Sequence, residues 1–387
     1  MKLLTIIGAR PQIIKAAAIS RAIQTHYNDQ IHEVIVHTGQ HYDKNMSEIF
    51  LSELGIPTPT YNLEVGSGNH GIQTSKIIIG IEELLIKEKP DYCLIYGDTN
   101  STIAGAIAAS KLHIPVVHIE AGLRSFNKNM PEEINRIATD HVSTLLFTPT
   151  KTGYKNLLNE GFKTDLNFPF DINKPGVFQC GDIMLDNSLY FAKVAEKKSD
   201  IITNIGVGKG EYILATIHRD HNTDDAESLN TIFSSFLEIV NKNKISIILP
   251  LHPRTKKRMN ELMDKDIHKS ILNNKFIHLI PPTSFLEMIA LEKHAKLIMT
   301  DSGGVQKEAY FFSKPCIILR PETEWVEIIE QGSAILCKAH KDDIISAFTS
   351  LNATHKKLIF PKIFGDGRAS EFILETLIEN SKKQAVI

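Results

Sequence analysis

Short apolar runs alternate with helix-forming segments along the whole chain, and this alternation restricts the fold more than any other feature. Each run has the length of a buried strand, and the segments between runs can form the crossover helices that parallel strands require. The runs form two series, at residues 3–7, 33–36, 92–96, 116–119 and 145–147, and then at 212–217, 245–251, 276–280, 297–300 and 316–319. The pattern predicts an α/β protein with two Rossmann-like, doubly wound domains.

The chain is long enough for two domains of ordinary size, because it has 387 residues. An aromatic, proline-containing stretch at residues 162–181 separates the two series of runs. We therefore expect an N-terminal Rossmann-like domain over residues 1–170 and a C-terminal Rossmann-like domain over residues 171–368. The last predicted helix falls within residues 369–387 and is expected to return to the N-terminal domain and complete it.

Composition argues against several classes of partner. The net charge is -2, with 42% hydrophobic and 23% charged residues, so nothing draws the whole chain to nucleic acid or to a membrane surface. The first apolar run, MKLLTIIG, is too short for a signal peptide. No apolar run reaches the length of about 20 residues that spans a bilayer. The four cysteines are isolated and form no metal-ligand spacing. We expect a cytoplasmic protein with reduced thiols and no metal.

The most polar strand-to-helix connection reads HIEAGLRSFNKNMPEEINR, over residues 118–136. Glu120 directly follows an apolar run, which predicts a position at the carboxyl end of a strand, where open parallel sheets bind ligands. Pro131 is suited to the first position of a helix, with Glu132 in the opening turn and Arg136 one turn later. A structural explanation also exists, because acids in a first turn favour the helix dipole and Glu132 with Arg136 is an ordinary i,i+4 pair.

Two more turns in the first half carry polar groups at predicted strand ends. The GARP turn starts a helix with Arg10 and Lys15 in its first turns, which outlines an anion site; a tight turn with two solvated cations is the alternative. The turn departs from the G-x-G-x-x-G fingerprint and so disfavours a dinucleotide site. In the GDTNST turn, Asp98 is either a cap of the following helix or a carboxylate for a sugar or for catalysis.

Histidines close two strands of the second half. His218 and His221 follow the run at residues 212–217, and His252 follows the next run. A histidine at a strand end beside an arginine is suited to proton transfer. We favour this role for His218, whereas His221 is expected to be structural.

The strongest pattern of the second half is DSGGVQKE, directly after the run at residues 297–300. Gly303 and Gly304 would let the start of a helix approach a diphosphate, with Ser302 at the turn. Glu308 lies one turn beyond Gly304 on the same helix face, where it could accept hydrogen bonds from ribose hydroxyls. The combination predicts a site for a nucleoside diphosphate.

Six motifs follow one another in the chain: GARPQIIK, YGDTNST, HIEAGLRS, MPEEINR, the strand-end HR and DSGGVQKE. Together they resemble the non-hydrolysing UDP-N-acetylglucosamine 2-epimerase family along nearly the whole chain. The resemblance implies a glycosyltransferase-B-like fold, with two domains facing across a cleft that closes over a UDP-sugar. It also implies inversion at sugar C2 by loss of UDP to give 2-acetamidoglucal, followed by its re-addition. We accordingly expect a cytoplasmic homodimer of polysaccharide biosynthesis that needs no cofactor.

The resemblance also implies roles for individual residues. The acid–base candidates are Asp98, Glu120 and Glu132, with His218 assisting at the leaving group, and their division of labour stays open. The substrate-binding candidates are Arg10, Lys15, Arg136, His252, Ser302, Gly303, Gly304 and Glu308. Glu133 is expected to be structural. This set of residues suits the chemistry. The C2 hydrogen is not acidic, so the bond to UDP breaks first and leaves positive charge at C1. Carboxylates can stabilise that charge and can also move the C2 proton.

The chain departs from the family pattern in places that bear on the substrate. The HR dipeptide is followed by DHN, residues 220–222, where the family usually has arginine, glutamate and asparagine. The segment that binds a second, activating UDP-N-acetylglucosamine in some bacterial members matches only at Gln40 and His41, and an arginine is missing from GSGNHGIQT. We therefore do not expect allosteric activation by substrate.

The loop at residues 125–130 is shorter than in the commonest members. It resembles the branch that acts on modified sugars, which makes a UDP-2,3-diacetamido-2,3-dideoxyglucuronate 2-epimerase the alternative. A retaining glycosyltransferase of the same fold and a non-catalytic nucleotide-sugar sensor are more distant alternatives.

Overall fold

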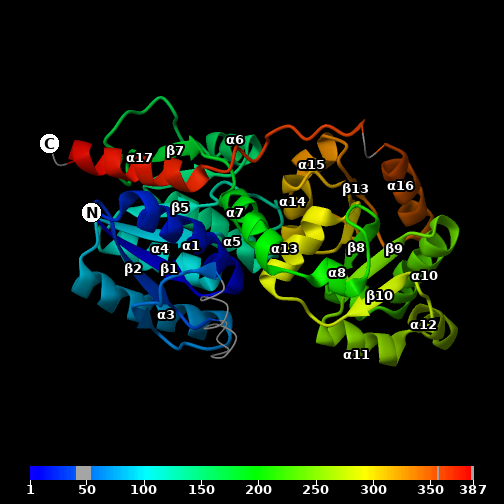
Figure 1. Cartoon of the computed structure of the whole chain (residues 1–387). Helices are drawn as coiled ribbons and strands as arrows, with labels where there is room; N and C mark the ends of the chain where they lie inside the picture. The colour runs from blue at the N-terminus through cyan, green and yellow to red at the C-terminus, as the bar shows by residue number, and fades with distance from the viewer. Residues whose placement is uncertain (41–53, 355–356, 385–387) are drawn as a thin grey trace. The chain divides into compact units, whose positions relative to one another are not determined.

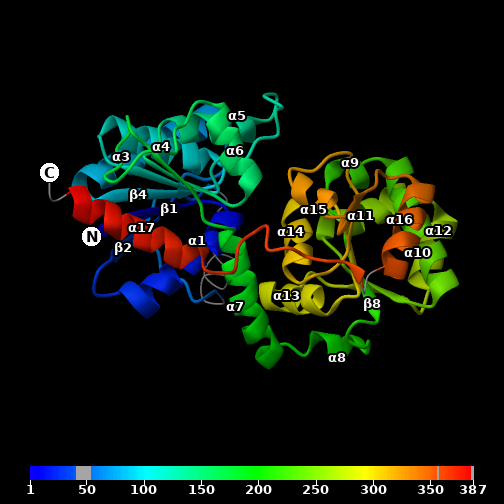
Figure 2. The same ribbon diagram turned by 90° about the horizontal axis from the view of Figure 1, so that it is seen from above.

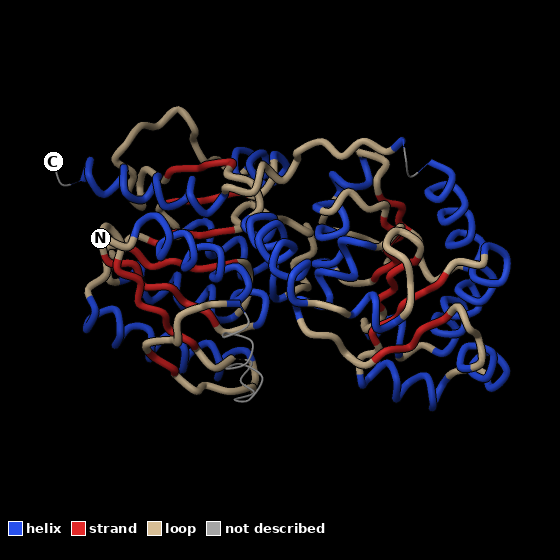
Figure 3. Tube along the Cα trace, in the orientation of Figure 1, coloured by secondary structure: helices blue, strands red, loops and turns tan. Residues whose placement is uncertain are grey.

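A computed structural model of the chain describes residues 1–40, 54–354 and 357–384. The chain divides into two compact units, one formed by Met1–Asn187 with Lys362–Ile387 and the other by Ser188–Pro361 (Figure 1). Each unit contains its own parallel sheet, and the tube drawing shows the strands in two separate groups flanked by helices (Figure 3). The predicted α/β architecture with two doubly wound sheets is confirmed.

The first sheet has the order β3-β2-β1-β4-β5-β6-β7, and all its strand pairs are parallel. Its strands are β1 (Lys2–Ile7), β2 (His32–His37), β3 (Tyr61–Asn62), β4 (Tyr92–Tyr96), β5 (Val116–Ile119), β6 (Leu145–Thr148) and β7 (Gly176–Gln179). The strand order reverses between β1 and β4. Ligands of doubly wound sheets bind at such a reversal, beside the carboxyl ends of the strands.

The second sheet has the order β10-β9-β8-β11-β12-β13 and is also parallel throughout. Its strands are β8 (Tyr212–Thr216), β9 (Ser246–Pro250), β10 (Ile277–Ile280), β11 (Leu297–Thr300), β12 (Cys316–Ile318) and β13 (Ala334–Leu336). Its reversal lies between β8 and β11. The turns that follow these two strands contain His218 and the DSGGVQKE motif, so the fold brings both motifs to the ligand-binding edge.

Helices cover both faces of each sheet (Figures 1 and 2). The first unit contains α1 (Arg10–Ala22), η1 (Ile23–Tyr27), α3 (His70–Glu88), α4 (Asn100–Lys111), α5 (Pro131–His141), α6 (Lys151–Asn159) and α17 (Ala369–Gln384). The second contains α8 (Ile201–Ile205), α9 (Asp220–Thr223), α10 (Ala226–Asn243), α11 (Pro253–Leu262), α12 (Lys265–Leu272), α13 (Phe285–His294), α14 (Gly303–Phe311), α15 (Val326–Glu330) and α16 (Lys341–Thr354). Helix α7 (Ile183–Lys198) contains the point of division. None of the described helices is both long and apolar enough to cross a membrane.

The division between the units falls after residue 187, rather than at the expected 170. The reason is β7, which lies inside the stretch that we expected to separate the domains. This strand pairs with β6 from Leu145 to Thr148 and so belongs to the first sheet. At the other end, the first unit resumes at Lys362 instead of residue 369.

Helix α17 lies in the first unit and is fixed there by two buried side chains. The carboxylate of Asp186 accepts hydrogen bonds from the backbone N–H of Ser370 at 2.8 Å and from its hydroxyl at 2.7 Å, which caps the start of the helix. Asn380 accepts from the N–H of Phe170 at 2.7 Å and donates to the hydroxyl of Tyr92 at 3.0 Å. The first unit is therefore assembled from both ends of the chain.

Candidate active site

Glu120 is the first residue after β5, at the carboxyl end of the first sheet. Its carboxylate forms an ion pair with the ammonium group of Lys15 in α1, and only 11% and 10% of the two side chains are exposed. The backbone of Glu120 is left-handed, with φ of 74°, and is held by hydrogen bonds of 3.0 Å from its N–H and that of Ala121 to the carbonyl of Phe147. Such a backbone costs about 1 kcal/mol or more at a non-glycine residue and persists where the surroundings enforce it. The Glu120 carboxylate is therefore rigidly placed.

The GARP turn differs from the predicted anion site. The side-chain oxygen of Gln12 accepts hydrogen bonds from the N–H groups of Gly8 and Ala9 at 2.9 and 3.1 Å, so these donors are already used. Lys15 is buried beside Glu120 and is not a solvated cation. Arg10 is exposed at the start of α1 and is the group of this turn that can reach an anion in solution.

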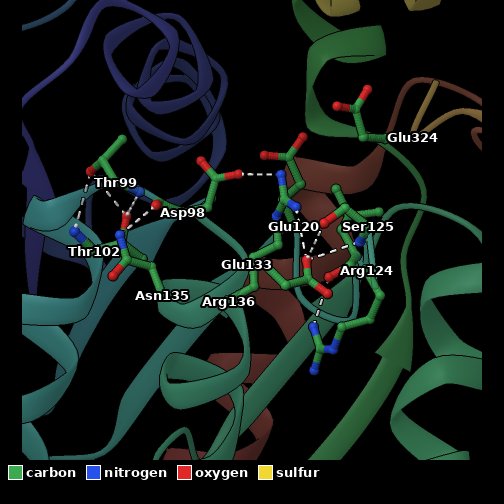
Figure 4. Close-up of polar contacts among 12 residues, drawn as sticks. Asp98, Thr99, Thr102, Glu120, Arg124, Ser125, Glu133, Asn135, Arg136 and Glu324 are labelled. Atoms are coloured by element: carbon green, nitrogen blue, oxygen red, sulfur yellow. Dashed lines mark hydrogen bonds and ion pairs between the residues drawn. The ribbon is translucent and has the colours of Figure 1, made fainter. Parts of the chain in front are cut away.

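Asp98 is not the cap of α4. Thr99 occupies that position, with its side chain accepting a hydrogen bond from the N–H of Thr102 at 3.3 Å. The carboxylate of Asp98 instead pairs with the guanidinium group of Arg136 at 2.6 Å, and its carbonyl accepts from the side chain of Asn135 at 2.9 Å (Figure 4). Helix α5 thus holds Asp98 through both its side chain and its backbone.

Helix α5 begins at Pro131, as predicted, but its acids differ in their surroundings. Glu133 is buried and accepts from the N–H and hydroxyl of Ser125, at 2.9 and 3.0 Å, and from the N–H of Phe126 at 2.9 Å. Burial acts to raise the pKa of Glu133, but these bonds outweigh it and lower the pKa below its ordinary value. Glu133 therefore anchors the loop at residues 125–130. Glu132 is exposed, and the i,i+4 pair expected with Arg136 is replaced by the Arg136–Glu133 pair at 3.1 Å.

A buried charge network behind these acids was not predicted. Nδ1 of His118 lies 2.6 Å from Asp140 and Nε2 lies 2.8 Å from the carbonyl oxygen of Gly97. Arg124 pairs with Asp140 at 2.8 Å and with Glu160 at 2.6 Å. Burial acts to raise the pKa of Asp140, but His118 and Arg124 lower it below its usual range. The ring of His118 therefore connects Asp140 with the carbonyl of Gly97, and it ties β5 to the turn that contains Asp98.

In the second unit, the completely buried carboxylate of Asp301 organises the turn after β8. It accepts from the N–H groups of His218 and Arg219, each at 3.0 Å, and from the side chain of Asn222 at 3.1 Å. Its other oxygen lies 3.3 Å from Nδ1 of His218. Burial lowers the pKa of His218, Asp301 acts in the opposite direction, and Arg219 and His252 lower it further. His218 is therefore oriented with Nδ1 toward the acid.

Helix α14 begins at Gly303 with Ser302 as its N-cap residue, as the motif predicts. The position that a Cβ would take at Gly303 is 3.7 Å from the guanidinium group of Arg320, and the position at Gly304 is 3.9 Å from the Ser302 hydroxyl. Arg320 is itself paired with Glu324 at 3.2 Å. The helix start is thus open to an approaching phosphate and has a guanidinium group beside it, which sequence reasoning did not assign.

Glu308 is buried in α14 next to a second carboxyl group, that of Glu292 in α13. Burial raises the pKa of Glu292 well above its ordinary value, and the charge and hydrogen bond of Glu308 raise it further. Two adjacent buried carboxyl groups cannot both ionise at low cost. Glu292 is therefore protonated more readily than an exposed carboxyl group.

Comparison with known proteins decides the family. The model for the family described as UDP-N-acetylglucosamine 2-epimerase matches residues 23–378. The chain belongs to this family. It is an isomerase of the UDP-sugar epimerase class, and the glycosyltransferase and sensor alternatives lose their support.

The relatives of this epimerase cover it almost completely. A UDP-N-acetylglucosamine 2-epimerase homolog of Methanococcus maripaludis is 49% identical over 97% of this chain and 99% of its own length. The UDP-2,3-diacetamido-2,3-dideoxy-D-glucuronate 2-epimerase of Pseudomonas aeruginosa is 47% identical over 97% and 99%. The crystal structure of the Methanocaldococcus jannaschii UDP-GlcNAc 2-epimerase in complex with UDP-GlcNAc and UDP is similar, with a TM-score of 0.81, 44% identity, and coverage of 98% of this chain and 100% of that one.

The departures of this epimerase from its family pattern have structural counterparts. Asn222 keeps the family's residue type and binds Asp301, whereas Asp220 and His221 beside it are exposed. Gln40 is buried, and its side-chain oxygen accepts from the hydroxyl of Ser101 at 2.7 Å. Residues 41–43, the rest of the segment linked to allosteric activation, lie outside the described part of the chain.

Proposed function

We propose that the chain interconverts UDP-N-acetylglucosamine and UDP-N-acetylmannosamine, by elimination of UDP to 2-acetamidoglucal and re-addition. The observation that carries the proposal is the pair of acids at the ends of the adjacent strands β4 and β5. Asp98 is held by Arg136 and Glu120 is held by Lys15. Two fixed carboxylates on neighbouring strands suit a reaction in which a proton leaves one face of a sugar carbon and returns to the other.

The proposed reaction begins with departure of UDP, because no carbonyl group acidifies the C2 hydrogen. The C1–O bond breaks with its electron pair leaving on the diphosphate, and positive charge develops at C1. A carboxylate of the pair Asp98 and Glu120 then removes the proton from C2, which forms the C1=C2 double bond of the glucal. Re-addition places a proton on the opposite face of C2 while the phosphate oxygen attacks C1. Glu132 is a third candidate for proton transfer, and its exposure leaves its carboxylate accessible.

The diphosphate is proposed to bind at the start of α14. The N–H groups after Ser302 and the dipole of the helix favour an anion there, and Gly303 and Gly304 let it approach closely. Arg320, beside the start of this helix, is the proposed cationic partner. Arg10 is a further proposed contact to the substrate. His218, oriented by Asp301, is proposed to protonate the leaving group.

The proposed binding of the remaining substrate groups follows from the same motifs. Glu308 accepts hydrogen bonds from the ribose hydroxyls. His252, which is exposed at the start of α11, is a further proposed contact to the substrate. We also propose that the protein acts in the cytoplasm, as a homodimer, in polysaccharide biosynthesis.

A UDP-2,3-diacetamido-2,3-dideoxyglucuronate is the second candidate substrate. Two observations favour it: the 47% identical relative with that activity in its name and the short loop at residues 125–130. The loop starts at Ser125 and Phe126, which Glu133 holds in place, so its conformation is defined at the point where a sugar substituent would be selected.

Isotope exchange tests the reaction and identifies the substrate. The wild type is incubated in heavy water with UDP-N-acetylglucosamine, its mannosamine epimer and the two diacetamido uronic acid nucleotides, with no acceptor present. We expect deuterium at C2 and appearance of the C2 epimer for one pair of nucleotides. Loss of exchange in Asp98→Asn and Glu120→Gln, with UDP binding retained, is the matched control. A wild type that binds UDP but exchanges none of the four would refute epimerisation and indicate a sensor.

A further inference from the structure

The second sheet carries a row of lysines at its amino edge, opposite the edge that holds the proposed diphosphate site. One lysine lies within three residues before each of five adjacent strands. In the strand order β10, β9, β8, β11 and β12, the members of this lysine row are Lys275, Lys244, Lys209, Lys296 and Lys314. Neighbouring strands are about 4.8 Å apart, so the row extends over about 19 Å. The same positions contain a single acid, Glu211.

The composition of the chain does not explain the lysine row. Acids and bases are nearly balanced, with 45 Asp and Glu against 43 Lys and Arg. The same positions before the strands of the first sheet contain two lysines, Lys89 and Lys174, and two aspartates, Asp29 and Asp91. The side-chain charges of that edge therefore cancel. Positive charge is concentrated at the amino edge of the second sheet alone.

The charges around His294, the last residue of α13, show how crowded this edge is. Burial lowers the pKa of His294, and the positive charges of Lys209, Lys293 and Lys314 lower that pKa further. Glu196 acts in the opposite direction and pairs with Lys293 at 2.6 Å. Burial also lowers the pKa of Lys314, and the charge of Lys293 adds to this effect. The like charges repel one another, and bound negative charge would relieve the repulsion.

The lysine row is free to meet an anion from solution. Within the part of the chain that the structure describes, no member of the row forms an ion pair with an acid. The ammonium groups of Lys244 and Lys275 instead lie 6.0 and 5.1 Å from the centre of the Phe276 ring. A cation over an aromatic face keeps its charge and much of its accessibility. The row therefore differs from Lys293, whose charge is already paired.

A cavity of about 420 Å³ opens in the middle of the lysine row. Its wall contains Lys244, Lys296 and Ser246, together with the glycine-rich loop at residues 206–211, which joins α8 to β8 (Figure 2). Small-molecule sites usually have volumes of about 300–1,000 Å³. The cavity is therefore large enough for a small ligand, and its two lysines give it a positive wall.

The glycine-rich loop suits the close approach of a ligand. Gly206 and Gly210 have left-handed backbones, with φ of 79° and 77°, and a Cβ at either position would have no neighbour within 4 Å. The N–H groups of Gly208 and Lys209 donate no hydrogen bond to any described residue. The carboxylate of Glu211 packs against Gly208. The wall thus offers two ammonium groups and two backbone donors against one carboxylate.

We propose that this cavity binds a small soluble molecule with two or more phosphate groups. Lys244 precedes β9 and Lys296 precedes β11, and β8 lies between these strands, so the two backbones are about 10 Å apart. Lysine binds phosphate as a point charge, so one phosphate satisfies one of these groups and a chain of phosphates spans both. The site is separate from the proposed diphosphate site, because α14 starts beyond the other end of β11, about 13 Å away along the strand.

Calorimetry on the full chain tests the site. UDP is present at saturation, so that the proposed diphosphate site is filled, while inorganic phosphate, pyrophosphate and tripolyphosphate are titrated separately. We expect one binding event per chain, with an affinity that rises with the number of phosphate groups. Absence of tripolyphosphate binding under these conditions overturns the proposal.

Removal of charge from the wall locates the site. The double variant Lys244→Gln, Lys296→Gln should weaken tripolyphosphate binding about 10-fold or more, because it removes two charged donors. The matched control is Lys265→Gln, Lys269→Gln, which removes the same charge from exposed positions of α12 and should bind like the wild type. An equal loss in both double variants would show a general effect of net charge and refute the site.

Glu211 provides a test of sign. Glu211→Gln removes the carboxylate from the wall and should tighten tripolyphosphate binding about 3-fold or more. Hydrogen exchange in the wild type should become slower in the loop at residues 206–211 when tripolyphosphate is added with UDP already bound. Weaker binding in Glu211→Gln, or protection confined to other segments, would count against the proposal.

Discussion

Replacement of Asp301 by asparagine is expected to reverse the orientation of the proton on His218. The oxygen that binds His218 N–H, Arg219 N–H and Asn222 can be kept by the asparagine, since an amide has one acceptor oxygen. The amide nitrogen must then occupy the position 3.3 Å from Nδ1 of His218. It donates to Nδ1, so the ring hydrogen moves to Nε2. The carboxylate of the wild type favours the opposite tautomer.

The expected cost separates catalysis from stability. Acid–base groups contribute about 10²–10⁴-fold to rates. The His218 side chain is 41% exposed and keeps some freedom to turn, so we expect a loss of about 10–100-fold in kcat. The three retained hydrogen bonds lose only their charge assistance, which costs about 1–2 kcal/mol of stability. The pKa of His218 should fall further, because Asp301 is the group that raises it.

The assay is steady-state epimerisation across pH, with UDP affinity measured by calorimetry. If protonated His218 assists the leaving group, the alkaline limb of the kcat profile should move to lower pH in Asp301→Asn. Asp220→Asn is the matched control, because it removes the same charge two residues from His218 at a side chain that is 73% exposed. A kcat within threefold of the wild type, or an equal loss in both variants, would refute the reasoning.

Three more substitutions probe other parts of the two units. Glu120→Gln should lower kcat at least about 100-fold and leave the affinity for UDP unchanged. Steady-state kinetics would measure the first effect and calorimetry the second. Lys15→Met should also lower kcat, because it removes the partner that fixes the Glu120 carboxylate. Glu133→Gln should lower the free energy of unfolding by about 1–3 kcal/mol in denaturant titrations, because a buried amide cannot accept all the bonds of Ser125, Phe126 and Arg136; an unchanged midpoint would contradict the anchoring role.

Glu292→Gln should stabilise the protein at alkaline pH. The raised pKa means that Glu292 keeps its proton to a higher pH in the folded state than in the unfolded state, where its pKa is about 4.3. Wild-type stability is therefore unpenalised below that pH and falls as pH rises toward the folded pKa. The variant lacks this loss and should gain about 1–3 kcal/mol at pH 8 and nothing at pH 4; a gain that is equal at both pH values would argue against a protonated Glu292.

Prediction from sequence succeeded where local pattern and sheet geometry coincide. Apolar runs and helix signals such as Pro131 placed two parallel sheets and their polar turns, because parallel strands leave few other topologies. The sequence leaves two roles open for Asp98, because an aspartate at a strand end can cap the next helix or serve as a carboxylate for a sugar or for catalysis. Asp98 pairs with Arg136 because the fold places the two side chains together. No local sequence pattern shows that these two distant residues are neighbours.

Sequence reasoning missed the roles of two buried residues, His118 and Asp301, for a different reason. His118 and Asp301 are the first residues of two motifs that the sequence makes prominent, but sequence reasoning assigned a role to neither of them. Their importance comes from buried partners far away along the chain: Asp140 for the histidine, and His218 and Asn222 for the acid. Buried polar groups must be paired, but sequence does not show which distant group supplies the partner.

The return of α17 to the first unit sets an order of events during synthesis. The second unit is one uninterrupted segment, Ser188–Pro361, and it can fold as soon as it leaves the ribosome. Synthesis of the first unit starts earlier, but its folding finishes later. The N–H of Phe170 has its acceptor only after Asn380 has been synthesised. A nascent chain that stops before residue 369 would therefore expose the surface that Ile373 and Leu377 cover. The unit that is synthesised first is therefore the last to become stable.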